Sequence, residues 1–124
     1  MNIGDRIRGS ADEEITIEDI DELLDRIKTA EPNVYAPSRM LGMATEQNPE
    51  LVQRRTHRIP EILEQNPPEL VKRSLYRILH ETDERSPAVL LSLVQAAPED
   101  LWRTTASTRV ILYELLERAA SEGV

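Results

Sequence analysis

One phrase occurs twice in this chain, as EQNPELVQR at residues 46–54 and as EQNPPELVKR at residues 64–73. In each copy, asparagine and proline precede an amphipathic stretch. Proline suits the first turn of a helix, where its missing N–H would be unpaired anyway, and Asn48 and Asn66 can act as N-caps. The first leucines of the two copies lie 19 residues apart, which leaves room for about three helical turns and a short connection. The repeated phrase therefore predicts consecutive antiparallel helices joined by short corners.

Prolines and capping residues divide the chain into about six predicted helices. They span roughly residues 17–30, 34–47, 49–65, 68–82, 87–96 and 98–121. The first begins with a capping box, formed by Thr16 as N-cap and Asp19 three residues later. Two prolines fall inside predicted helices. Pro60 should kink its helix, because it removes a hydrogen bond to the carbonyl of Thr56, and Pro37 should delay the start of the second helix.

Apolar residues recur with helical spacing after each copy of the phrase. One arc of the fourth helix holds Leu70, Val71, Leu75, Ile78 and Leu79, and one arc of the third holds Leu51, Val52, Ile59, Ile62 and Leu63. Val34 and Val71 lie 37 residues apart, the length of one helical hairpin. Hairpins repeated at this period stack so that each buries its apolar stripe against its neighbours. The predicted fold is an all-α, short right-handed superhelix of about three hairpins, and a compact multi-helix bundle is the alternative.

The hairpin period, the kink expected at Pro60 and two segments of the chain resemble HEAT repeats. The segments are EPNVYAPSRMLGMATEQNPELV and PEDLWRTTASTRVILYELLERA, and the resemblance covers residues 17–121. It implies a non-enzymatic scaffold or adaptor that mediates protein–protein interaction through a concave surface lined by the second helix of each hairpin. Some members of such families bind nucleic acid. A small regulator built as a helical bundle is the alternative if the hairpins do not stack.

Length and charge limit the class of protein. A chain of 124 residues forms one domain, predicted over residues 15–124, after a flexible tail over residues 1–14. No apolar run approaches the roughly 18 residues needed to cross a bilayer, and no export leader is visible, so we expect a cytoplasmic location. The net charge of −8 argues against nucleic-acid binding, which depends largely on phosphate neutralisation. This acidic composition, with two lysines and no phenylalanine, resembles that of proteins from extreme halophiles.

Basic residues gather in the middle of the chain, where residues 39–77 carry seven bases and five acids. Side chains from adjacent helices there form a stripe that could dock an acidic partner. The candidate residues are Arg54, Arg58, Arg73, Arg77 and His80, with Tyr76 flanking them. Acids interleave with the stripe at helical spacing, pairing Glu50 with Arg54, Glu69 with Arg73, Arg58 with Glu61, and Arg77 with Glu81. The alternative is a solvated face of salt bridges without a binding role.

Arg55 and Arg109 fall within apolar arcs of their predicted helices. A guanidinium there needs a carboxylate or helix-end carbonyls, because an unpaired buried charge is costly. Each could be an internal tie between helices, a long side chain that reaches the rim, or part of an anion-binding pocket. A break of the last helix at residues 104–108 would instead reset its phase and move Arg109 to the surface.

Aromatic and aliphatic residues give two further predictions. Tyr35, Tyr76, Trp102 and Tyr113 lie at or near apolar arcs, which predicts core or core-edge positions, with interface anchors as the alternative. The last helix carries Ile111, Leu112, Leu115 and Leu116 over more than one face. We therefore expect that the C-terminal helix can bury apolar surface against a second copy of the chain.

No motif in the chain indicates catalysis. Cysteine is absent, and the two histidines, His57 and His80, do not have the spacing of metal ligands. The chain contains neither a nucleophile elbow nor a glycine-rich phosphate loop. We expect no catalytic residue, no metal site and no cofactor.

Overall fold

The protein is all-α in the part of the chain that its computed structural model describes, which is Ile3, residues 14–29 and residues 35–124, with only the backbone of residues 96–103. Seven α-helices and one 3-10 helix, η1, occur between residues 14 and 124 of this part. They are α2 (Ile17–Lys28), α3 (Tyr35–Gln47), α4 (Pro49–Gln53), η1 (Thr56–Arg58), α5 (Ile59–Glu64), α6 (Glu69–Glu81), α7 (Pro87–Arg103) and α8 (Ala106–Ser121). The all-α prediction is confirmed.

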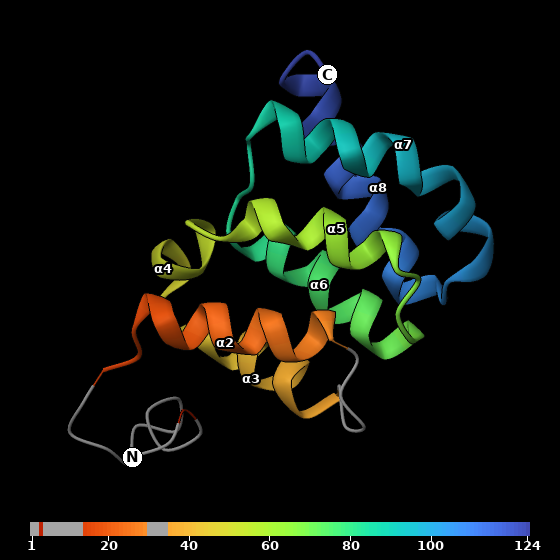
Figure 1. Cartoon of the computed structure of the whole chain (residues 1–124). Coiled ribbons are helices and arrows are strands. Elements are labelled where there is room, and N and C mark those ends of the chain that lie inside the picture. The colour runs from red at the N-terminus through yellow and green to blue at the C-terminus, as the bar shows by residue number, and fades with distance from the viewer. Residues whose placement is uncertain (1–2, 4–13, 30–34) are drawn as a thin grey trace.

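The helices form two layers (Figure 1). In the first layer, α5 lies between α2 and α7 and packs against both. In the second layer, α6 lies between α3 and α8 and packs against both. Chain neighbours join the layers, because α2 packs on α3, α5 on α6, and α7 on α8. Packing in chain order is compatible with a short superhelix and also with a compact bundle.

Capping residues start two of the helices as predicted. Thr16 Oγ1 accepts from the Asp19 N–H at 3.3 Å, and Asp19 Oδ2 accepts from the Thr16 N–H at 2.9 Å, which completes the capping box of α2. Asn48 caps α4 by accepting from a first-turn N–H at 3.2 Å. Asn66 does not cap α6. It adopts a left-handed φ of 54° after α5, and Pro68 takes the N-cap position of α6 without a side-chain bond.

The predicted helix over residues 49–65 is broken rather than kinked, because the segment divides into α4, η1 and α5. Pro60 accounts for part of this break, since it cannot donate to the carbonyl of Thr56. The Thr56 side chain also lies at this break. It is buried, and its hydroxyl bonds the buried carboxylate of Glu84 in the loop between α6 and α7. A tertiary contact therefore fixes the break.

The corner between the last two helices lies beyond the predicted place. The sequence predicts a corner at Pro98, but α7 runs through this proline and ends five residues later. The chain turns at Thr104 and Thr105, beside the start of α6. There the Glu69 carboxylate accepts from the Thr105 N–H and from the Thr108 hydroxyl, each at 3.3 Å. The bond from the Thr105 N–H replaces a helical bond that is lost at the corner.

One aliphatic core joins the two layers. Its fully buried members include Ile20, Leu23, Leu24, Leu41, Ile59, Ile62, Leu75, Ile78, Leu79 and Leu90. Leu70 does not belong to it, although the sequence predicts that it shares the apolar arc of α6, because its side chain is 58% exposed. The predicted tail over residues 1–14 lies outside the described residues except for Ile3, which is buried, and Glu14, which is exposed.

Candidate functional site

Two central arginines form ion pairs with α2. Arg55 Nε lies 2.8 Å from Asp21 Oδ1, so Arg55 is an internal tie between helices, one of the three alternatives for this residue. Arg58 pairs with Asp21 at 3.4 Å and also with Asp25. Its side chain is 21% exposed. Arg58, predicted to bind a partner, is therefore engaged within the molecule.

The candidates on α6 lie in different surroundings. Tyr76 is completely buried in the core, so the prediction that it flanks a binding surface is wrong. His80 pairs through Nε2 with the carboxylate of Glu114 on α8. Arg77 is 58% exposed and makes the predicted pair with Glu81, at 3.0 Å. Arg73 is exposed one turn before Arg77.

A shallow groove between α3 and α6 brings three arginines together. It consists of two adjoining cavities, of about 310 and 200 Å³, which share Ser38, Arg39, Ser74 and Arg77. The first cavity adds Tyr35, Leu70 and Arg73, and the second adds Glu46 and Glu81 with several less polar residues. We call this surface the α3–α6 groove. Its two helices run in the same direction, because the start of each lines the first cavity and the end of each lines the second.

Arg39 and Arg73 have no carboxylate within ion-pair distance among the residues that the structure describes. Both are exposed, so an unpaired charge costs little there. The predicted pair of Arg73 with Glu69 is absent because Glu69 is bonded to the start of α8. Arg39 is not among the residues predicted from the sequence, although it lies 34 residues before Arg73, close to the predicted hairpin length. Arg54, the remaining candidate, is exposed at the end of α4 and does not line the groove.

Arg118 makes the helix tie that Arg109 was a candidate to make. The chain breaks at residues 104–105, so α8 has its own phase and Arg109 is exposed, as the phase-reset alternative predicts. Arg118 is 13% exposed and donates to the carbonyls of Leu79 and His80, at 3.2 and 3.3 Å. A cation at this end of α6 also complements the helix dipole. Neither Arg109 nor Arg118 therefore needs an anion-binding pocket to accommodate its charge.

The outer surface of α8 carries Val110 and Tyr113, which are 56% and 55% exposed. Of the four residues predicted to spread over more than one face of this helix, Leu112 and Leu115 are buried, and Ile111 and Leu116 are half-buried. Tyr35 is 47% exposed, so two of the predicted core-edge tyrosines lie at the surface. The side chain of Trp102 is outside the described part. Self-association through α8 stays a prediction, and Val110 and Tyr113 are the residues that would carry it.

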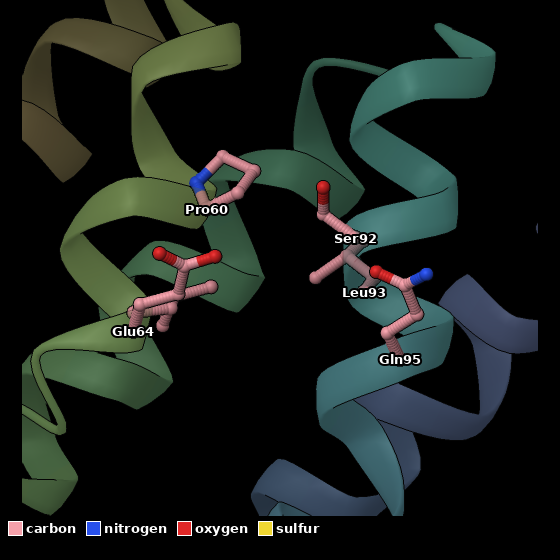
Figure 2. A pocket seen from close by; sticks show the side chains of 6 residues that line it. Pro60, Glu64, Ser92, Leu93 and Gln95 are labelled. Atoms are coloured by element: carbon pink, nitrogen blue, oxygen red, sulfur yellow. The ribbon is translucent and has the colours of Figure 1, made fainter.

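A separate cavity lies between α5 and α7 in the first layer (Figure 2). Pro60, Leu63 and Glu64 of α5 and Ser92, Leu93 and Gln95 of α7 line it. It encloses about 230 Å³, less than the about 300–1,000 Å³ usual for small-molecule sites. Among its described lining residues, Glu64 alone is charged. The α3–α6 groove is the stronger candidate because its larger cavity brings three arginines together beside two exposed apolar side chains.

None of the described helices combines the length and the apolar character that crossing a bilayer requires. In the described ranges, no three His, Cys, Asp or Glu side chains form a group that could hold a metal ion. Comparison of the chain with models of known families, with curated proteins and with solved structures finds no match. The resemblance to HEAT repeats therefore rests on the sequence features alone.

Proposed function

We propose that this protein is a non-enzymatic, cytoplasmic helical scaffold that binds another protein through the α3–α6 groove. The observation that carries the proposal is that exposed Tyr35 and Leu70 meet, on one surface, Arg39 and Arg73, which have no carboxylate partner among the described residues. Tyrosine and arginine are enriched among residues that dominate protein interfaces, because they combine large contact area with directed polar groups. The HEAT resemblance supports the same surface, since it assigns partner binding to second helices, and α3 and α6 are the second helices of the first two hairpins.

Binding of nucleic acid through the same arginines is the weaker reading. Affinity for a phosphate backbone comes from many Lys and Arg contacts, and this chain has a net charge of −8. The groove supplies three arginines, one of which is already paired with Glu81. A partner that combines apolar and acidic side chains fits this lining better than a uniform polyanion does.

Site-directed photocrosslinking tests the proposal. A photoreactive benzoylphenylalanine replaces Leu70, which lines the groove, and in a control protein it replaces Leu91 on α7. The two leucines are matched, because both are exposed, at 58% and 48%, and they lie in opposite layers. We expect discrete protein adducts from position 70 in nuclease-treated cell extract, and their loss when Arg73→Glu is added.

Three results would reject the proposal. Adducts from position 91 that match those from position 70 would mean that proteins do not bind the groove in preference to the surface of α7. Adducts that disappear with nuclease would identify nucleic acid as the ligand. Adducts from position 70 that persist unchanged with Arg73→Glu would show that the arginines do not contribute to binding.

A further inference from the structure

The α3–α6 groove has a defined polarity along its length. Tyr35 and Leu70 stand at the start of the two helices and form an apolar end, and Glu46 and Glu81 form an acidic end. Arg39, Arg73 and Arg77 form a basic centre between the two ends. Because α3 and α6 are parallel, the like groups of the two helices lie at the same end of the groove.

We infer that the groove binds an extended acidic segment of a partner protein whose side chains follow one order of charge along the groove. An apolar side chain of that segment lies at the apolar end and its carboxylates lie at the basic centre. The segment places no carboxylate of its own at the acidic end of the groove. A basic or neutral residue of the segment fits there instead. This inference rests on the proposed function and adds the chemistry of the partner.

Charge complementarity carries the first step. Arg39 and Arg73 lack carboxylate partners among the described residues, whereas Arg55 and Arg58 are paired with α2. An incoming carboxylate can therefore bond two guanidiniums without displacing an existing partner. Bonds of this kind between charged groups are about twice as strong as neutral hydrogen bonds, and arginine can bind a carboxylate through two parallel N–H groups.

The acidic end of the groove favours an acidic peptide over a nucleic acid. A single strand carries a phosphate at every nucleotide and would place negative charge beside Glu46, and beside Glu81 in its pair with Arg77, as well as beside Arg39 and Arg73. A peptide can alternate its charges and avoid this repulsion. The apolar end adds to the preference, because Leu70 has no polar group to offer a phosphate backbone.

Helix geometry sets the length of the segment. Leu70 and Glu81 are separated by eleven positions along α6, or about 16 Å at 1.5 Å per residue. An extended chain covers that distance with about five residues, at roughly 3.3 Å each. The expected pattern is therefore an apolar residue, two or three acidic positions, and then a basic or neutral residue. The segment can run from its N-terminus to its C-terminus in either direction along the groove, because the groove contacts its side chains and not its backbone.

Selection from a bacteriophage-displayed library of random peptides, longer than the groove, tests this inference. The bait is the intact protein, and phage retained by the Arg73→Glu variant are first removed. We expect an enriched consensus in which an apolar residue is followed, in one chain direction, by acids and then by a non-acidic residue. A synthetic consensus peptide should lose at least about tenfold in affinity with Arg73→Glu, since like charges then meet across the interface.

Arg54→Glu is the matched control, because Arg54 is an exposed arginine outside the groove. It should leave the affinity for the consensus peptide within about twofold, and both variants should unfold at the temperature of the parent. A basic or purely apolar consensus, an equal loss with Arg54→Glu, or no enriched consensus would overturn the inference. Binding of single-stranded or duplex oligonucleotides more tightly than the peptide would also overturn it. Protein adducts from position 70 together with a non-acidic consensus would reject the segment chemistry and leave the scaffold function in place.

Discussion

Thr56→Val should destabilise the protein more than an ordinary buried Thr→Val substitution. Thr56 and Glu84 are each 3% exposed, and the Thr56 hydroxyl lies within hydrogen-bond distance of one carboxylate oxygen of Glu84 and, at 2.9 Å, of the Gln53 carbonyl. The other oxygen accepts from the Ser86 N–H at 2.7 Å. Valine keeps the shape of the side chain and removes the hydroxyl, so one oxygen of a buried charged group loses its donor. A hydrogen bond to a charged group contributes about 1.5–3 kcal/mol.

We therefore expect a loss of about 1.5–3 kcal/mol in the free energy of unfolding, or roughly 4 °C in Tm for each kcal/mol at this chain length. Urea unfolding followed by far-UV circular dichroism measures this loss, with comparable m-values required for the comparison. Thr45→Val is the matched control. Thr45 is 2% exposed, and its hydroxyl donates at 2.8 Å to the Leu41 carbonyl of its own helix, so its loss should cost less than about 1 kcal/mol. Equal losses in the two variants would refute the assignment of Thr56 as the residue that fixes the break between α4 and α5.

Three further outcomes are expected. Arg118→Met should cost about 1–3 kcal/mol, because it removes the charged donor to the Leu79 and His80 carbonyls, which keep only backbone and hydroxyl donors from the following turn. Arg54→Met should cost under about 0.5 kcal/mol in the same urea titration. Lys28 donates to Glu61 at 2.6 Å and lowers the pKa of that carboxyl from its usual 4.5. The unfolded state therefore binds a proton at Glu61 more tightly than the folded state does. The stability that this ion pair contributes is lost as pH falls below about 4.5. Lys28→Met should flatten that acid dependence, and an unchanged pH profile would contradict the pairing. Sedimentation at micromolar concentration should show a self-associated species that Tyr113→Asp dissociates, and a monomeric mass for the parent would reject self-association.

Local rules predict most of the helices in this chain. The capping box at Thr16 and the cap at Asn48 depend only on residues within one turn, so a sequence pattern is sufficient to find them. The same holds for the pair of Arg77 with Glu81, which lie four residues apart on one helix. These features are readable because their physical cause is contained in the segment that shows them.

Features that depend on distant parts of the chain were mispredicted. Arg58 bonds carboxylates that lie 33 and 37 residues earlier, and no spacing rule identifies them. The corner at Thr104 and Thr105 is set by Glu69, 36 residues before Thr105, so Pro98 was the more visible but wrong signal. The sequence does not distinguish a proline in the first turn of a helix from a proline within a helix. Only the tertiary bonds around the proline determine which of the two positions it takes.

The positive charge of the groove is a product of tertiary placement and not of composition. The chain has 23 acidic and 15 basic residues, so enough carboxylates are present to pair every arginine. Folding uses the acids of α2 for Arg55 and Arg58, and it uses Glu69 for the start of α8. Arg73 thus loses its nearest helical partner to another helix and remains beside Arg39. An acidic chain thereby presents a local basic surface, and a partner segment that fits it must match the groove's sequence of charges, because the net charge of the molecule repels it elsewhere.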